Sequence, residues 1–182
     1  MSKSDQLDER LSFMKMDELA RENIRNIKQI IMRALPGALD QFYEEVDRRP
    51  ETKRFFSGAR HVASAKGRQV DHWDAISSGR FDDDYVRAVT TVGETHARIG
   101  LEPRWYIGGY ALVLETLIAA VTAARWPGKA PWRRQASASQ VAAELGALTK
   151  ATLLDMDYAI SVYLAAADAA RREAEAQVLA AR

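Results

Sequence analysis

Apolar residues recur at helical spacing through residues 85–110, and this pattern predicts two consecutive helices. In the first helix, spacings of three and four residues place one apolar stripe on a single face. The stripe consists of Tyr85, Val89, Val92, His96 and Ile99. The acidic run Asp82–Asp84 suits the positive end of this helix, Gly100 suits the left-handed position that ends it, and Pro103 suits the first turn of the next. The two helices therefore meet at a corner beside His96, whose side chain we expect to face the interior.

The same periodicity continues along the rest of the chain and predicts an all-α fold with no strands. The expected helices are a short leading helix at 5–13, then Met14–Arg33, Ala38–Asp47, a short turn from Pro50 to Phe55–Phe56, Ala59–Ile76, and a very long C-terminal helix capped by Ser137 or Ser139. We expect Pro36 and Gly37 to separate the second helix from the third, because proline disrupts a helix interior. Pro127–Arg134 is expected to be a loop.

The helix that begins at Pro103 is apolar on more than one face. Its residues Trp105–Trp126 are almost free of charge, which comes close to a transmembrane signature. A mid-span carboxylate at Glu115 would cost about 2.5–3.5 kcal/mol in a bilayer, and the amphipathic helices elsewhere need an apolar partner. We therefore expect a central buried helix and no membrane insertion. Its surplus apolar surface favours a homodimer, formed through the Pro103 helix and the C-terminal helix.

The end of the chain differs from the rest in composition. From Ala165 onward the sequence keeps a high helix propensity but loses large apolar residues, so this segment cannot pack a core by itself. The whole chain of 182 residues with 47% hydrophobic content suits one well-filled core. We therefore expect one domain at 1–165 and a helical linker at 166–182.

Charge and cysteine content narrow the function classes. The net charge of +1 predicts no attraction to nucleic acid or to an anionic membrane. The absence of cysteine excludes disulfides, thiolate nucleophiles, cysteine zinc sites and covalent haem attachment. The first residues lack the basic and then apolar run of a secretory signal, which favours a cytoplasmic protein.

Two side chains at inward positions are candidates for chemistry. His96 is either a core histidine with satisfied ring nitrogens or an axial ligand to haem iron through a neutral imidazole nitrogen. Tyr43 faces the core from the helix at 38–47, and it is either a core-edge aromatic or a hydrogen-bond donor to a ligand. His61 and His72 are expected at the surface or rim, although His61 is also considered as a second iron ligand. The histidine spacings contain no i, i+4 pair of the zinc type.

Residues 10–165 contain several motifs in a characteristic order. The run His96-Ala97-Arg98-Ile99-Gly100-Leu101, followed by Trp105-Tyr106-Ile107-Gly108-Gly109-Tyr110, is similar to the proximal-histidine segment in the globin domains of bacterial globin-coupled sensors. Phe42-Tyr43 is similar to its distal tyrosine and the preceding phenylalanine. Phe55-Phe56 and His72-Trp73 are further matches.

The resemblance implies a globin fold that holds haem b noncovalently, with His96 as the metal ligand. It also implies that Tyr43 donates a hydrogen bond to bound dioxygen, and that Tyr106 engages the other ring nitrogen of His96. Ala65 and Gln69 are candidates for the distal pocket, but a shift of one residue would replace Ala65 by Lys66. The expected apolar walls are Phe42, Val62, Ala65, Val92, Ile99, Trp105 and Ile107.

The function implied by this resemblance is sensing of dioxygen, with carbon monoxide and nitric oxide as further ligands. A dimer interface would relay the signal to a C-terminal output module, such as a chemotaxis-type signalling domain or a diguanylate cyclase. The sensor domain itself would not be catalytic. Two alternatives stay open: a cofactor-free dimerisation or scaffold bundle, and a globin-type haem enzyme.

Overall fold

The computed structural model describes residues 3–126 and 136–181, and these residues form seven helices and no strands. The helices are α1 (Lys3–Phe13), α2 (Glu18–Arg48), α3 (Pro50–Lys53), α4 (Ala59–Ser77), α5 (Asp83–Ile99), α6 (Pro103–Arg125) and α7 (Ala138–Ala180). This confirms the prediction of an all-α fold with a short leading helix and a long C-terminal helix. The loop expected at Pro127–Arg134 lies outside the described residues.

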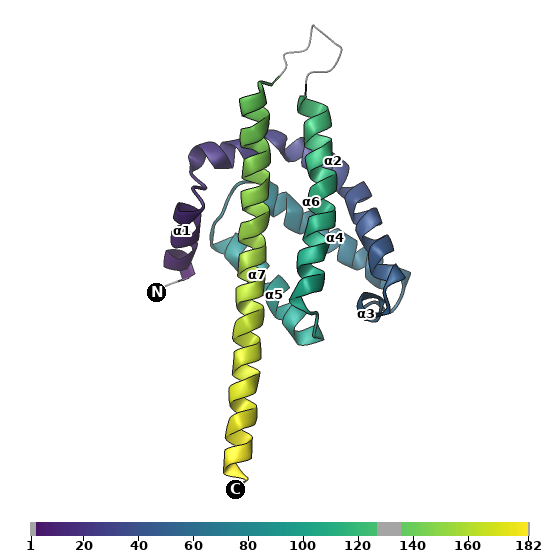
Figure 1. Cartoon of the computed structure of the whole chain (residues 1–182), viewed down its shortest axis with the longest axis vertical. Coiled ribbons are helices and arrows are strands. Elements are labelled where there is room, and N and C mark those ends of the chain that lie inside the picture. Colours follow the sequence, from purple (N-terminus) through teal and green to yellow (C-terminus); the bar gives the residue numbers. More distant parts are fainter. Residues whose placement is uncertain (1–2, 127–135, 182) are drawn as a thin grey trace.

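The first half of the chain departs from the expectation in one respect, because α2 runs unbroken through Pro36. A proline removes one backbone hydrogen bond and crowds the carbonyl four residues earlier, at a cost of about 3 kcal/mol. The buried residues Ile31, Leu35 and Leu39 lie on both sides of Pro36 and keep the helix packed through this point. The chain bends instead of breaking, and Figure 1 shows α2 changing direction near its middle. The predicted start at Met14 was also early, since α2 begins after the N-cap Asp17.

The corner between α5 and α6 forms as the sequence predicts. The side chain of Asp82 accepts a hydrogen bond from the backbone N–H of Tyr85 at 3.0 Å and caps the start of α5. Gly100 ends the helix with a φ of 70°, in the left-handed region. Pro103 occupies the first turn of α6. His96 therefore lies in the last turn of α5, directly before the corner.

Helices α6 and α7 lie side by side in front of α2, α4 and α5 (Figure 1). Only one stripe of α6 is buried, formed by Tyr106, Val113, Leu117 and Val121. The surplus apolar surface that the sequence predicted on α6 is present, because Ile107 and Leu112 on its other faces are exposed. Of the helices described, α6 is the one long and apolar enough to cross a membrane, and its buried stripe packs against α2 and α7.

Helices α5 and α7 make an unusually close contact at Gly93. A Cβ atom added to Gly93 would lie 2.9 Å from the backbone oxygen of Ala159 and 2.9 Å from Cβ of Val162. Contacts of this length do not occur between ordinary side chains, so only glycine lets the two backbones approach so closely. This contact lies one helical turn before His96 and holds the histidine-bearing helix against α7.

The C-terminal part of α7 leaves the body of the protein. From Leu164 to Ala181 every residue is exposed, and Figure 1 shows α7 extending well beyond the other helices. Leu164, Val178 and Leu179 are the large apolar side chains on this segment. We call residues 164–181 the exposed tail of α7.

Candidate functional site

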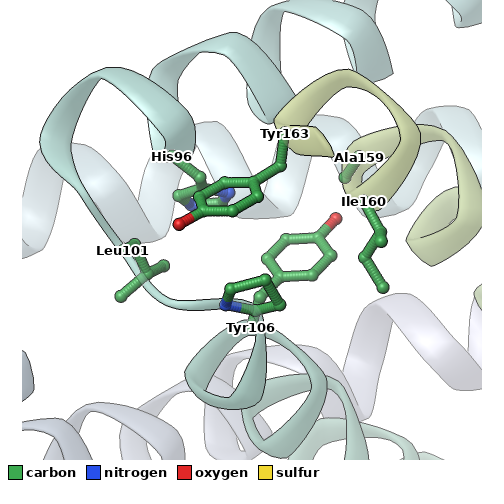
Figure 2. A pocket seen from close by; sticks show the side chains of 7 residues that line it. His96, Leu101, Tyr106, Ala159, Ile160 and Tyr163 are labelled. Carbon is green, nitrogen blue, oxygen red and sulfur yellow. The ribbon is translucent and has the colours of Figure 1, made fainter. Parts of the chain in front are cut away.

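His96 faces a small apolar cavity at the α5–α6 corner. The cavity has a volume of about 10 Å³ and is lined by His96, Leu101, Pro103, Tyr106, Ala159, Ile160 and Tyr163. Figure 2 shows Tyr163, which comes from α7, and Tyr106, which comes from the start of α6, among the side chains that line this cavity with His96. A space of this size holds about one water molecule.

The imidazole of His96 is neutral at physiological pH. Burial, and then the charge of nearby His72, lower its pKa from 6.5 to about 4, while the charge of Asp155 acts in the opposite direction. The Nδ1 atom of His96 is buried and has no hydrogen-bond partner in the described part of the chain. A neutral imidazole with a nitrogen free of hydrogen bonds is the form that binds metals.

The free imidazole nitrogen of His96 is suited to be the axial ligand of a haem iron. The cavity beside it, however, is too small to accommodate a haem macrocycle. Pockets for ligands of this class measure about 300–1,000 Å³. The cavity beside His96 is therefore smaller in this structure than a haem pocket. Among the described residues no group of three His, Asp or Glu side chains lies close enough to hold a metal ion, so His96 would act as the only protein ligand on its side.

Tyr106 contacts His96 through its ring, at a centroid distance of 4.9 Å in an edge-on arrangement. Its hydroxyl is directed elsewhere, to the hydroxyl of Tyr110 at 3.2 Å and to Oδ2 of Asp155 at 3.4 Å. The expected hydrogen bond from Tyr106 to the imidazole is therefore not formed in this structure. The physical reason is that the buried carboxylate attracts the phenolic proton more strongly than a neutral ring nitrogen does.

Asp155 is the centre of a buried polar cluster that sequence reasoning missed. Nε2 of His72 lies 2.9 Å from both carboxylate oxygens, the hydroxyl of Tyr85 lies 3.1 Å from Oδ1, and the hydroxyls of Tyr106 and Tyr110 donate to Oδ2. His72 was expected at the rim, but its side chain is only 11% exposed and that of Asp155 is fully buried. The sequence does contain a feature that indicates a buried carboxylate, because Asp155 interrupts an apolar stripe of α7 at spacings of three and four residues.

The carboxylate controls the protonation of its partners. Burial alone would lower the pKa of His72, but the charge and the hydrogen bond of Asp155 outweigh burial and raise it. Burial, and then the charge of Asp155, raise the pKa values of Tyr85, Tyr106 and Tyr110 well above the ordinary range. The three tyrosines therefore remain hydrogen-bond donors at physiological pH.

Tyr43 belongs to a second apolar cluster, formed by α2, α4 and the segment after α3. The members of this cluster are Phe42, Tyr43, Val46, Phe56, Val62 and Ala65. The Tyr43 ring meets Phe42 and Phe56 edge-on, at centroid distances of 4.9 and 5.5 Å. Burial raises the pKa of Tyr43 to about 12, although the charge of Arg68 partly opposes this. The hydroxyl is therefore a protonated donor at physiological pH.

The structure fixes the register of α4. Ala65 is buried against the Tyr43 cluster, whereas the ammonium group of Lys66 pairs with Asp40 at 2.5 Å and lies 5.4 Å from the Tyr43 ring centroid. Lys66 also lines an open groove of about 490 Å³ together with Tyr43 and charged residues of α2. Gln69 is half-buried, and its Oε1 atom is buried without a hydrogen-bond partner in the described residues.

The candidate residues thus fall into two groups, and five others, Gln69 among them, belong to neither. Phe42, Tyr43, Val62 and Ala65 come together in the cluster of α2 and α4, and His96 meets Tyr106 at the cavity. Val92 and Trp105 are half-buried, while Ile99 is 42% exposed and Ile107 is 44% exposed. Ile99 lies six residues after Gly93, which places it about 120° around α5 from the face that contacts α7.

Comparison with known proteins gives two findings. The family model described as Protoglobin matches residues 3–169. The fold is similar to the globin domain of a Geobacter sulfurreducens globin-coupled sensor, with a TM-score of 0.73 and 17% identity over 86% of this chain and 96% of that one. It is also similar to the ferrous globin domain of E. coli DosC, with a TM-score of 0.62 and 19% identity over 86% of this chain and 96% of that one.

Proposed function

The chain belongs to the protoglobin family, whose model spans residues 3–169, and on this basis we propose that it is a haem-based gas sensor domain. His96 would hold the iron of a noncovalently bound haem b, and dioxygen would be the main ligand, with carbon monoxide and nitric oxide as others. The observation that carries this proposal is the neutral imidazole of His96, which has a buried nitrogen without a partner at the predicted corner. A haem iron supplies the coordination position for the gas.

Tyr43 is the proposed donor to the bound gas. Its support is a phenol that stays protonated within an apolar cluster of two helices, where a hydrogen bond to a partly negative acceptor is strong. Gln69 is a second candidate, because its buried side-chain oxygen has no partner among the described residues. The walls of the proposed pocket include Phe42, Val62 and Ala65.

We further propose that the domain acts as a homodimer through α6 and α7 and that it is cytoplasmic. Both helices carry large exposed apolar side chains, namely Ile107, Leu112, Leu153 and Leu164. Residues 1–165 would form the sensor, and 166–182 would be the linker that passes the signal to an output module. The close contact at Gly93 would carry a displacement of α5 into α7. In this proposal the sensor domain performs no catalysis itself.

The proposed ligand can be tested with His96→Ala and with His61→Ala as a matched control, since His61 is exposed on α4. We expect His96→Ala to lose stoichiometric haem, measured by the Soret absorbance, and added imidazole to restore a bound spectrum by filling the vacated position. His61→Ala should bind haem like the wild type.

Two outcomes would contradict the proposal. A wild-type ferrous spectrum in His96→Ala would show that another residue holds the iron. A wild-type protein that binds no haem after reconstitution would favour a cofactor-free scaffold, and turnover of an organic substrate by the isolated domain would favour a haem enzyme.

A further inference from the structure

The carboxylate of Asp155 joins α7 to three other helices. Its donors come from α4 (His72), α5 (Tyr85) and α6 (Tyr106 and Tyr110). A carboxylate offers about four lone-pair positions, so these four donors fill its capacity. No other side chain in the described part of the chain receives hydrogen bonds from three different helices.

The cluster requires a carboxylate at this position. A buried carboxylate is costly unless it is hydrogen-bonded, and Nε2 of His72 lies 2.9 Å from its oxygens. An asparagine at position 155 would have the same shape, but its amide nitrogen would face groups that are themselves donors. At least one donor would then lose its acceptor, and the matching tyrosine or histidine would have to turn away.

The cluster reaches His96 through Tyr106. The ring of Tyr106 lies edge-on to the imidazole at 4.9 Å, while its hydroxyl is directed to Asp155. Figure 2 shows this ring beside His96 with its hydroxyl pointing toward α7. Tyr85 binds the same carboxylate from α5, the helix that carries His96. Asp155 therefore holds both the helix of the imidazole and the ring beside it.

We propose that Asp155 is a positioning residue for His96, which fixes the Tyr106 ring against the imidazole and ties that contact to α7. The importance of this contact for an iron ligand rests on the proposed function, because outer partners of a metal-bound histidine set its orientation and basicity. The contact itself is a property of the chain and can be measured without haem.

The first measurement uses the haem-free protein. We expect proton NMR to show nuclear Overhauser contacts between the Tyr106 ring and the His96 ring in the wild type, and their loss in Asp155→Asn. Asp157→Asn is the matched control, since Asp157 lies on the same helix, is 42% exposed and pairs with Arg10 outside the cluster. The control should retain the contacts.

The second measurement uses the haem-loaded ferrous protein without gas. We expect the iron–histidine stretching band in resonance Raman to shift in Asp155→Asn and to stay at the wild-type frequency in Asp157→Asn. Tyr106→Phe keeps the ring but removes one hydroxyl, so it should shift the band in the same direction by a smaller amount. This variant also serves if Asp155→Asn fails to fold.

The outcomes separate the two proposals. Unchanged ring contacts in both Asp155→Asn and Tyr106→Phe would overturn the positioning role, as would an equal effect of Asp157→Asn. Loss of the contacts in Asp155→Asn, together with a wild-type chain that binds no haem, would overturn the proposed function while supporting the positioning role. Loss of the contacts together with an unshifted Raman band would confine Asp155 to packing and overturn its role toward the ligand.

Discussion

Substitution of Gly93 by alanine tests the close approach of α5 and α7. The added methyl group would lie 2.9 Å from Ala159 O and 3.1 Å from Ala159 Cα, and these backbone atoms cannot rotate away. Relief to an ordinary contact of about 3.5–4.0 Å requires α5 to move by about 0.5–1 Å. Overpacking of this kind costs about 1–3 kcal/mol. Alanine regains about 0.5–1 kcal/mol over glycine in a helix, so the net destabilisation is up to about 2.5 kcal/mol.

The matched control is Gly67→Ala in α4, where the new methyl group would meet no atom within 4 Å. This control should raise the unfolding free energy by about 0.5–1 kcal/mol. Urea unfolding of the two haem-free variants should therefore differ by the overpacking cost of about 1–3 kcal/mol. In thermal melts each kcal/mol corresponds to a shift of about 2–4 °C. Equal stabilisation by both substitutions would show that α5 and α7 are not in close contact at Gly93.

Three further predictions follow from the site and the surface. Tyr43→Phe should raise the dioxygen dissociation rate about 10–100-fold, because a hydrogen bond to a charged acceptor contributes about 1.5–3 kcal/mol, while stopped-flow dissociation of carbon monoxide should change far less. The isolated chain should sediment as a dimer, and a monomeric wild type would refute this prediction. Leu153→Glu should make the chain monomeric, whereas Phe13→Glu, at another exposed apolar side chain, should leave it dimeric. In the haem-free protein, between pH 6.5 and about 4, His96 binds fewer protons in the folded state than in the unfolded state. The contribution of His96 to the unfolding free energy should therefore fall by about 3 kcal/mol as the pH drops through this window. Urea titrations should show this loss in the wild type and not in His96→Gln.

Local signals in the sequence were sufficient for most helix boundaries. Asp82, Gly100 and Pro103 act through backbone geometry within a few residues, so the corner after His96 could be predicted without tertiary information. Pro36 was misjudged for the opposite reason. Its helix-breaking cost is local, but the packing that outweighs it comes from residues on distant helices.

The candidate site was predicted less completely than the fold. Tyr43 and His96 were recognised by their place in apolar stripes and by resemblance, and in the structure Tyr43 is buried and His96 is half-buried. The Asp155 cluster escaped because its members are spread over 84 positions, from 72 to 155, and meet only through the packing of four helices. The exposure of Ile99 and Ile107 was missed because helical periodicity predicts which face of a helix is apolar. It does not predict how much of that face a neighbouring helix covers.

The exposed tail of α7 is continuous with the part of the helix that carries Asp155, so both share one helical phase. A helix turns about 100° for each residue, and the 43 residues of α7 span about 65 Å. A small rotation of α7 at the cluster would therefore swing each tail side chain through the same angle, with little change in reach. Removing one residue from the tail would misalign everything beyond it by about 100°, while removing seven would misalign it by only about 20°. A straight helix preserves the angular positions of its side chains, so a change in tail length of seven residues alters those positions far less than a change of one residue.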